Sequence, residues 1–513
     1  MDAAAQKRSA GQSSQGSGSQ RQRGSDGKAT KNVQDDDEQN EEGLQFEDPF
    51  GDEFEDEQFD DELNEQLEDN DGDNDDDDDD DGDEGGAKIR KEQASRKSQG
   101  QLLVDEDEEN EGGPKEVWRP GVDQIPEGEA LEYDPSAYVM YHSLQAEWPC
   151  LSFDIMRDTL GENRQRFPLT MFAVTGSQAD RADKNKVTLL KLSDLQTTQT
   201  DEDDEDEDEN VDEDPTIEHV NVAHAGGVNR IRSMPQNPGF VATMADTSQV
   251  HIFDFSDSLR SMMTKGPRGV APTKPLFSFR GHRSEGYALD WSPAAAGRLA
   301  TGDCAGAIHV WNGSGANWQV DAKAFTGHTG SVEDIQWSPT EGTVFSSASS
   351  DRTVRIWDTR GKTGPQISID AHLDDVNVIS WNRSVAYLLA SGCEDGSFKV
   401  WDLRAVRDNK SPLAHFKYHK GPVSSIEWAP HDESVICLSS RDNQVTVWDL
   451  SVEADDAASA ADPFLTEFPA QLLFIHQGQT NVKEIHFHPQ IPGLIMSTAE
   501  DGFNVFKPAI SVA

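Results

Sequence analysis

Histidine, aspartate and tryptophan recur together along the second half of the chain, and side chains of these types could carry chemistry. His328, Asp351 and Trp357 lie within one such unit. A histidine beside an aspartate can act as a general base, whereas the same groups buried together can satisfy one another's hydrogen bonds. Because buried polar groups require such partners, we interpret the set as a structural network and not as a catalytic site.

Other signatures of catalysis and of cofactor binding are missing from the sequence. It contains no nucleophile elbow, phosphate loop or cluster of metal ligands, and no GxGxxG follows a strand pattern. The acids stand mostly in runs, which favours solvation over tuned acid–base pairs. We therefore expect a protein that is not an enzyme and needs no metal or cofactor. The four cysteines form no CxxC pair, which indicates a reducing compartment; they are Cys150, Cys304, Cys393 and Cys437.

The elements that position these residues repeat along the chain. Four units begin with a histidine and end with a tryptophan, and their histidines follow one another at intervals of 46, 44 and 47 residues. Two weaker units flank them, from His224 to Phe253 and from His476 to Phe506. The first and last residues of the four stronger units are His282 and Trp311, His328 and Trp357, His372 and Trp401, and His419 and Trp448.

Each unit alternates short strands with tight turns. One unit reads VEDIQW, TVFSSAS and TVRIWD, and a period of roughly 40–45 residues is typical of a four-stranded propeller blade. Residues 150–223 add LSFDIM, PLTMFAV and KVTLLKL for a first blade. The sequence thus predicts an all-β, seven-bladed propeller. We expect LSFDIM to join the last blade and close the ring, because an open ring would leave unpaired edges.

This pattern resembles the WD-repeat family, through the Gly-His pairs at 281–282 and 327–328 and the Trp-Asp pairs at 357–358, 401–402 and 448–449. In that family the histidine, a strand Ser or Thr, a turn aspartate and the tryptophan share a buried network. The turn aspartate is present six residues before the tryptophan in three units, whereas Ala305 takes its place in the unit of His282. We expect an incomplete network there and in the two units that end in phenylalanine. The three turn aspartates are Asp351, Asp395 and Asp442.

The formal net charge of −53 is concentrated in two segments. Residues 35–113 hold 37 acids against 5 bases, and residues 201–214 hold 12 acids and no base. Such dense runs repel themselves and stay solvated, so we expect disorder there. They also repel nucleic acid, whose phosphates require Lys and Arg. The expected partner is therefore a strongly basic protein, without direct contact to nucleic acid.

Residues 1–114 are expected to form a disordered, acidic arm of low complexity. Its spaced phenylalanines could anchor a client that the acids attract, and a purely solubilising tail is the alternative. A basic island at residues 87–97 is a candidate nuclear-import signal. The candidate client contacts are Phe46, Phe50, Phe54, Phe59, Asp75, Asp76, Asp77, Asp78, Asp79, Asp80 and Asp81, and the import candidates are Lys88, Arg90, Lys91, Arg96 and Lys97.

Residues 115–149 are expected to include a helix that flanks the propeller, with a favourable start at Asp134-Pro135 and an end at Trp148-Pro149. This segment resembles the amino-terminal helix of the histone-binding WD-repeat proteins, the retinoblastoma-binding and chromatin-assembly subunits. The resemblance implies one wall of a groove for a basic client helix, and a helix that merely covers the propeller is the alternative. The residues near one face at helical spacing are Tyr138, Tyr141, Leu144 and Gln145.

The other wall is expected from the insert at residues 451–478, which stretches the interval from His419 to His476 to 57 residues. Its LLFIH sequence resembles the negatively charged loop of the same histone-binding family, although the proline pair of that loop is absent. A plain structural insert is the alternative. The candidate client contacts in the two acidic loops are Glu202, Asp203, Asp204 and Glu205, and Glu453, Asp455, Asp456 and Asp462.

Two units end in the pattern WDxR, which places Arg360 and Arg404 after Trp-Asp pairs. In resembling proteins this pattern marks receptors that dock on a cullin-type ubiquitin ligase. The alternative is that each arginine is an ordinary exposed residue at the end of a strand.

The combined pattern resembles one subfamily, the glutamate-rich WD-repeat proteins, called ribosome assembly protein in yeasts. The resemblance spans roughly residues 115–510 and includes EWPCLSFDI, the acidic arm and the acidic insert of the first blade. It implies an escort of large-subunit ribosomal protein three for assembly of the 60S subunit, with pre-ribosomal particles as partners, in the nucleus and nucleolus and with shuttling to the cytoplasm. Some members are described as histone binders, so a histone chaperone and a ligase receptor remain alternatives.

We expect a monomer with three parts: the arm at 1–114, the flanking segment at 115–149, and the propeller at 150–513 with acidic inserts at 197–215 and 451–469. No apolar signal core and no apolar run of ~18 residues occurs, so we expect no membrane contact.

Overall fold

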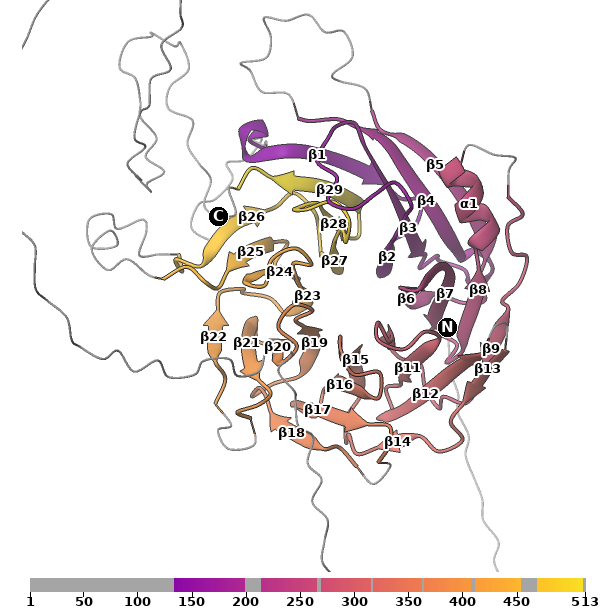
Figure 1. Cartoon of the computed structure of the whole chain (residues 1–513), viewed down its shortest axis with the longest axis vertical. Helices are drawn as coiled ribbons and strands as arrows, with labels where there is room; N and C mark the ends of the chain where they lie inside the picture. Colours follow the sequence, from indigo (N-terminus) through magenta and orange to yellow (C-terminus); the bar gives the residue numbers. More distant parts are fainter. Residues whose placement is uncertain are drawn as a thin grey trace, which may run out of the picture. The chain divides into compact units, whose positions relative to one another are not determined.

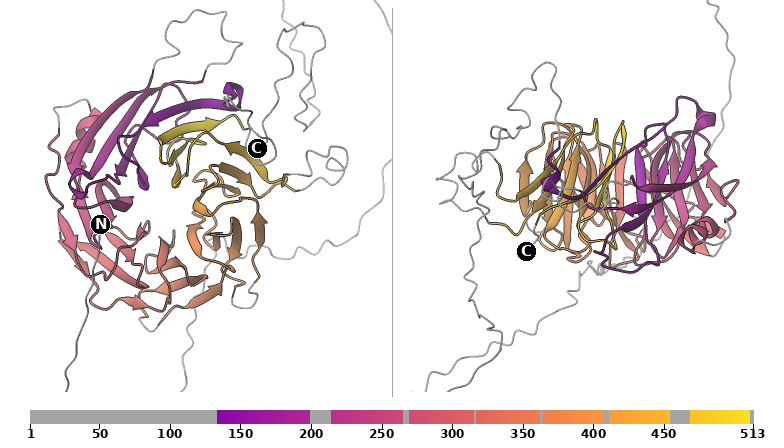
Figure 2. Two further views of the ribbon diagram at one scale, coloured as in Figure 1. Left: turned by 180° about the vertical axis from the view of Figure 1, so that it is seen from behind. Right: turned by 90° about the horizontal axis from the view of Figure 1, so that it is seen from above.

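The computed structural model describes residues 133–198, 214–264, 269–314, 317–361, 364–406, 411–453 and 468–510. These residues form seven antiparallel sheets, arranged as blades around a central channel (Figure 1). Seen from above, the blades stand side by side in the ring (Figure 2). The predicted seven-bladed, all-β propeller is confirmed. The predicted arm at 1–114 and the centres of both acidic inserts lie outside the described residues.

In blades 1 to 6 the strands run in sequence order from the channel outward, and the chain passes from the outer strand of one blade to the inner strand of the next. Blade 1 consists of β2 (Ser152–Met156), β3 (Leu169–Gly176), β4 (Lys186–Leu195) and β5 (Thr216–Ala223). Blade 2 consists of β6 (Val228–Met234), β7 (Asn237–Ala245), β8 (Val250–Asp254) and β9 (Phe277–Phe279). Blade 3 consists of β10 (Ala288–Trp291), β11 (Arg298–Gly302), β12 (Ala307–Ser314) and β13 (Asn317–Val320), and β14 (Phe325–Thr326) also pairs with β12.

Blades 4 to 6 repeat this order without an extra strand. Blade 4 consists of β15 (Val332–Trp337), β16 (Val344–Ser349), β17 (Thr353–Asp358) and β18 (Ile367–Asp370). Blade 5 consists of β19 (Val376–Trp381), β20 (Leu388–Cys393), β21 (Ser397–Asp402) and β22 (Ala414–Lys417). Blade 6 consists of β23 (Val423–Trp428), β24 (Val435–Ser440), β25 (Val445–Asp449) and β26 (Leu472–His476).

Blade 7 combines the two ends of the described chain. Its strands are β27 (Glu484–Phe487), β28 (Ile495–Thr498), β29 (Gly502–Pro508) and β1 (Tyr138–Gln145). Outside the sheets lie the helix α1 (Ser256–Thr264), which covers blade 2, and the 3-10 turns η1 (Pro135–Ala137) and η2 (Ala182–Lys184). Of the described helices, none has the length and apolar character needed to cross a bilayer.

The strand that closes the ring is β1, which pairs antiparallel with β29 and places Tyr141 opposite Phe506 and Leu144 opposite Phe503. The prediction that LSFDIM closes the ring is wrong, because those residues form β2, the innermost strand of blade 1. Blade 1 is complete with β2 to β5, so only a strand upstream of it can supply the outer position in blade 7.

The predicted helix over residues 135–148 is also wrong. The side chain of Asp134 caps a single 3-10 turn, accepting from the backbone N–H of Ser136 at 3.0 Å, and the chain then continues as β1. A short helix here would have only its own hydrogen bonds, whereas the free edge of β29 offers a full ladder and a core. Met140 and Leu144 enter that core, with 0% and 9% of their surfaces exposed.

The recurring His, Asp and Trp side chains form the interior network of the blades. In blade 4, Nδ1 of His328 lies 2.9 Å from Oδ2 of Asp351, and Nε2 lies 2.6 Å from Oγ of Ser347. The indole N–H of Trp357 donates to the same Oγ at 2.8 Å. Burial lowers the pKa of His328, so the ring stays neutral at pH 7 and its hydrogen bonds fix one tautomer.

Blade 3 holds a complete network, which corrects the expectation based on Ala305. Asp303 lies 3.1 Å from Nδ1 of His282, and Thr301 links Nε2 of that ring at 2.8 Å to the indole N–H of Trp311 at 3.0 Å. Asp303 stands two residues before Ala305, and its other carboxylate oxygen accepts the backbone N–H groups of Ala305 and Ala307. The aspartate therefore caps the turn and meets the histidine from a different position in the sequence.

The other blades vary the same network. In blade 6 the hydroxyl comes from Thr446 on β25, 3.0 Å from Nε2 of His419. In blade 5, His372 contacts Ser391 at 2.8 Å, and Asp395 accepts from Ser397 at 2.6 Å instead of meeting the ring. In blade 7, where Phe506 replaces tryptophan, the ring of His476 stacks on Phe506 and no indole bond exists.

Replacing Asp351 with alanine should lower the free energy of unfolding by about 2 kcal/mol, since the buried Nδ1–H of His328 would lose its acceptor. Urea unfolding followed by tryptophan fluorescence would measure this. Asp395→Ala is the matched control, because Asp395 lies at the equivalent place without touching its histidine, and it should cost less than half as much. Equal losses at both positions would contradict the network.

Candidate functional site

An aromatic cluster lies where β1 of blade 7 passes β26 of blade 6, and we define it as Tyr133, Tyr138, Tyr141 and Phe474. The hydroxyl of Tyr138 lies 2.8 Å from Nδ1 of His476, and its ring stands edge-on to Phe474 with 5.4 Å between centroids. The rings of Tyr133 and Tyr141 lie 4.8 Å apart. Because Tyr133 is 53% exposed, the cluster offers solvent an apolar surface at the blade edge.

The acidic insert arises beside this cluster. It joins β25 to β26 and leaves the described residues after Glu453, whose side chain is exposed. The four residues Leu472–Ile475 of β26 are each only partly buried, so the strand that follows the insert also presents apolar surface. The chain therefore enters the acidic insert from the end of β25 and returns from it into β26, the strand that carries Phe474.

The structure separates the residues that the sequence grouped on one helix face. Tyr138 and Tyr141 belong to the aromatic cluster, whereas Leu144 is buried in the inner core with Phe153, and Gln145 lies opposite Gly502 in the ladder. Glu453 is the acidic-loop candidate that can be placed. The other predicted contacts lie outside the described residues; they are Glu202, Asp203, Asp204, Glu205, Asp455, Asp456, Asp462, and every named residue of the arm and of the import candidate.

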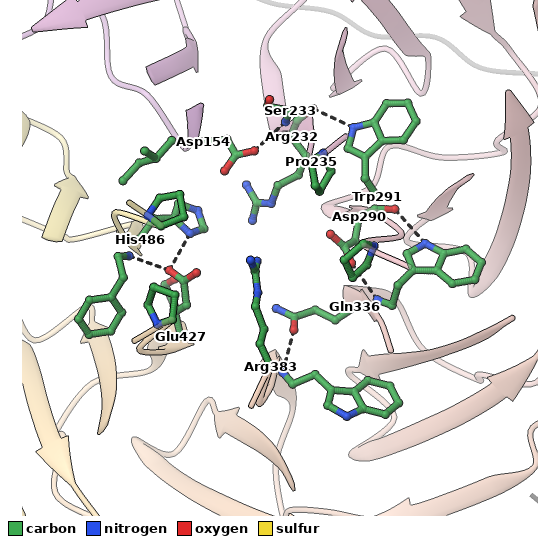
Figure 3. Close-up of a pocket in the computed structure, with 18 of the residues that line it drawn as sticks. Asp154, Arg232, Ser233, Pro235, Asp290, Trp291, Gln336, Arg383, Glu427 and His486 are labelled. Atoms are coloured by element: carbon green, nitrogen blue, oxygen red, sulfur yellow. Dashed lines mark hydrogen bonds and ion pairs between the residues drawn. The ribbon is translucent and has the colours of Figure 1, made fainter. Parts of the chain in front are cut away.

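The central channel holds a second polar site, with a cavity of about 150 Å³ (Figure 3). The inner strand of each blade contributes one side chain to the channel, and we call this set the channel ring. In blades 3 to 6 this residue directly precedes the last residue of the inner strand, a tryptophan distinct from the tryptophan of the blade network, and in the other blades it takes the equivalent place. Asp290 accepts the backbone N–H of Trp337 in the next blade at 2.8 Å, and Gln336 accepts that of Trp381 at 2.8 Å. Five members of the channel ring bond their blade to the next in this way, whereas Arg232 pairs with Glu484 and His486 with Glu427. The channel ring comprises Asp154, Arg232, Asp290, Gln336, Ser380, Glu427 and His486.

Charged groups in the channel are paired near Glu484. This carboxylate receives Arg230 at 2.5 Å and Arg232 at 2.7 Å, and 1% of its side chain is exposed. Burial by itself would lower the pKa of His486, but the carboxylates of Glu427 and Glu484 raise it to about 9. The ring of His486 is therefore cationic at pH 7 and lies 3.0 Å from Glu427.

A signal for the channel is present in the sequence, although no known motif contains it. Residues such as Arg232, Glu427 and His486 interrupt apolar strands at one fixed place relative to the end of the strand. When the four units with a tryptophan on the inner strand are aligned, the polar side chains of Asp290, Gln336, Ser380 and Glu427 fall in register. An alignment does not show that these side chains meet in the central channel, because they do so only when the seven blades close into a ring.

Metal-ligand types gather at one place among the described residues. The ligand atoms of His372, Cys393 and Asp395 lie within 4.8 Å of one another. Two of these groups already serve the blade network, because His372 bonds Ser391 and Asp395 bonds Ser397. All four cysteines are free thiols.

The two WDxR arginines are exposed and held in place by their own motifs. Arg360 pairs with Asp358 at 2.6 Å, and Arg404 pairs with Asp402 at 3.0 Å. The guanidinium of Arg404 also lies 3.3 Å from the ring centroid of Tyr387. The two side chains are 66% and 46% exposed, so equivalent corners of blades 4 and 5 present a fixed cation.

Fold and sites define the class, a WD-repeat β-propeller protein with a polar channel. The family model "WD domain, G-beta repeat" matches residues 320–358, 364–402 and 410–449. A second family model, that of histone-binding protein RBBP4 and its counterpart in the CAF1 complex, matches residues 128–196, which include β1 and most of blade 1.

Three relatives are similar over most of their lengths. "Protein HEAT STRESS TOLERANT DWD 1" of Arabidopsis thaliana is 46% identical over 77% of this chain and 92% of its own. "Ribosome assembly protein rrb1" of Schizosaccharomyces pombe is 45% identical over 79% and 87%, and "Glutamate-rich WD repeat-containing protein 1" of Dictyostelium discoideum is 48% identical over 78% and 86%. The chain therefore belongs to the family of glutamate-rich WD-repeat and ribosome assembly proteins, which confirms the resemblance.

Replacing Asp290 with asparagine should change the pH dependence of stability. Burial raises the pKa of Asp290 to about 7 from an ordinary value near 3.8. Because the pKa of Asp290 is higher in the folded than in the unfolded protein, its contribution to the free energy of unfolding is fully present at a pH below the unfolded-state pKa. This contribution is lost as the pH rises through the folded-state pKa of about 7. The Asp290→Asn variant lacks this titration and does not lose this stability. The difference in the free energy of unfolding between the variant and the wild type should therefore shift by about 2 kcal/mol in favour of the variant from pH 5 to pH 8.

Urea unfolding of both proteins at the two pH values would measure this difference. Glu433→Gln, an exposed carboxylate in blade 6, is the control. A difference between Asp290→Asn and wild type that stays constant with pH would contradict the assignment.

Proposed function

We propose that this chain is a ribosome assembly factor that escorts a basic client, large-subunit ribosomal protein three, to 60S assembly in the nucleus and nucleolus. The observation that carries the proposal is the aromatic cluster, of which Tyr133 is 53% exposed and Phe474 lies on the strand that follows the acidic insert, since apolar anchors flanked by carboxylates suit a basic protein segment. The relative from fission yeast, named a ribosome assembly protein, supports the same direction.

The mechanism has three parts. The acidic segments at 35–113 and 201–214 attract the client over a distance and screen its charge. The edge of blades 6 and 7 holds a specific segment through the aromatic cluster. Release follows when ribosomal RNA, a stronger polyanion, competes with the carboxylates for the client.

No chemical step is needed for this cycle. The histidine of blade 4 is engaged in a structural network, and Arg230 and Arg232 of the channel form ion pairs with Glu484. The expected function is therefore binding and not catalysis, driven by charge and by exchange of partners.

Deleting residues 35–113 should weaken the binding of purified large-subunit ribosomal protein three at least about tenfold, because charge steering and screening would be lost. Titration at several salt concentrations would measure the affinity, and the salt dependence should become shallower. Deleting residues 1–34, which lack the acidic run, is the control and should change little.

A pull-down of the full chain from cell extract would identify the client directly. A near-stoichiometric ribosomal protein supports the proposal. Histones in its place would move the function to a chromatin chaperone, which the match to the histone-binding family model favours as the second candidate.

The fixed arginines support a further candidate, a receptor for a cullin-type ubiquitin ligase. Arg360→Ala combined with Arg404→Ala should abolish co-purification of a ligase adaptor if this role exists, and it should leave client binding intact. Co-purification measured by mass spectrometry tests this role, with Arg260→Ala, another exposed ion-paired arginine, as the control. An adaptor that still co-purifies with the double variant would refute docking through these arginines.

A further inference from the structure

The outer strand of blade 1, β5, differs from the outer strands of the other blades and lies on the outside of the ring (Figure 1). It has eight residues, whereas the outer strands of blades 2 to 6 have three to five. Its first four side chains, Thr216 to His219, are all exposed. Among the described residues, no other outer strand has two exposed side chains in a row. The first half of β5 therefore stands clear of the neighbouring blades.

The backbone of β5 leaves hydrogen-bonding groups free along its outer edge. The N–H of His224 donates to the carbonyl of Asn185 at 2.9 Å, just beyond the end of the β4–β5 ladder and in the same register. In an antiparallel ladder, residues face the partner strand at every second position counted from such a bond. The N–H and carbonyl groups of the residues between them point away from β4, and in the described part of the chain no other segment bonds to these groups. The residues with an outward backbone are Ile217, His219, Asn221 and Ala223.

The outer strand of blade 7 has the same length but not the same free edge. The carbonyl of Val139 in β1 accepts the N–H of Thr198 at 3.1 Å. Nε2 of His142 lies 3.2 Å from the carbonyl of Gln196. The segment that follows β4 thus covers part of β1. Proteins usually shorten or cover the edge of a sheet because it pairs readily with another chain, so the long, uncovered edge of β5 is suited to binding an extended segment.

Charge selects the kind of segment that can pair with this edge. The run at residues 201–214, with 12 acids and no base, ends one residue before β5 begins. Two copies of the protein paired through β5 would bring two such runs together and repel each other, whereas a basic segment would be attracted. On β5 itself, the side chain of Glu218 is half exposed and pairs with Lys191, and Ile217 is 49% exposed. A cationic side chain opposite Glu218 and an aliphatic one opposite Ile217 would complement the strand.

We propose that β5 receives an extended basic segment of a client protein as a fifth strand of blade 1. The outward backbone groups of β5 bind the main chain of the segment, and the acidic run selects it by charge. The preferred segment alternates lysine or arginine with aliphatic residues. This inference rests on the proposed escort function and deepens it, because it assigns the client a second contact on blade 1, whereas the aromatic cluster belongs to blades 6 and 7.

The test introduces a proline that removes one outward N–H from β5. In His219→Pro the ladder with β4 keeps its hydrogen bonds, because the N–H of His219 does not face β4. This variant should bind purified large-subunit ribosomal protein three about tenfold more weakly than the wild type, since it lacks one donor and its ring blocks a new strand. Fluorescence titration of the full chain at about 150 mM salt measures the affinities, because distant charges are largely screened there.

The matched control is Ser368→Pro in β18, the outer strand of blade 4. The N–H of Ala371 donates to the carbonyl of Arg352 at 3.0 Å, and the register then points the backbone of Ser368 outward. This variant should bind within about twofold of wild type, as exposed substitutions away from a contact usually do. His219→Ala keeps the N–H and should bind more tightly than His219→Pro, which separates loss of the donor from loss of the imidazole.

Hydrogen exchange of the wild-type chain, measured by mass spectrometry, gives a second readout. In the free protein the outward amides of β5 should exchange quickly, because they have only water as an acceptor. In the complex with the ribosomal protein these amides should become protected, whereas those of β18 should not change. This measurement needs no variant, so it decides the question even if His219→Pro has a lower thermal midpoint.

Protection of β5 in the complex, together with weak binding by His219→Pro, supports the inference. If the wild type binds the ribosomal protein but β5 gains no protection, or His219→Pro binds like Ser368→Pro, the inference is overturned and the escort function stands. A wild-type dimer in sedimentation that His219→Pro dissolves would assign the edge to a second copy and also overturn the inference. If the wild type binds no ribosomal protein, both fall.

Discussion

Pairing between β1 and β29 is the interaction on which the rest of the structure depends. It joins residues near 140 to residues near 505 and turns seven separate sheets into a closed ring. Closure removes the free edge that would otherwise expose backbone donors and acceptors. It also creates the channel, and it carries Tyr138 and Tyr141 to β26, so the channel and the aromatic cluster exist only after the two ends of the propeller meet.

The channel shows how a propeller solves the cost of polar groups at its centre. Five members of the channel ring accept backbone N–H groups of the next blade through their side chains, as Asp290 does for Trp337. Where charges gather, Glu484 meets two arginines, and His486 gains a proton because Glu427 and Glu484 stabilise its cation. Breaking one partner would leave a buried charge, which costs several times more than the pair contributes.

The acidic segments and the folded propeller differ in the range of the interactions that they can make. The acidic segments carry most of the net charge of −53, and in the proposed escort function they attract the client over a long range, an interaction that is fast and sensitive to salt. Selectivity needs short-range contacts at fixed positions, and the propeller offers these at the aromatic cluster. Attraction by the segments and selection by the folded surface together suit a protein that holds a basic, aggregation-prone client and later gives it up.

The sequence by itself determined the number of blades, their strands and the position of most network residues, because each blade is a local unit whose apolar alternation and turns are written in about 45 consecutive residues. The sequence did not predict contacts between residues that lie far apart along the chain. Residues 138–145 have helical spacing, yet the free edge of β29, more than 350 residues away, makes them a strand. Asp303 and Thr446 replace expected network positions because distance in space, not spacing in sequence, decides which oxygen reaches a histidine. The channel ring likewise arises only from closure of the propeller, since its side chains lie dozens to hundreds of residues apart along the chain.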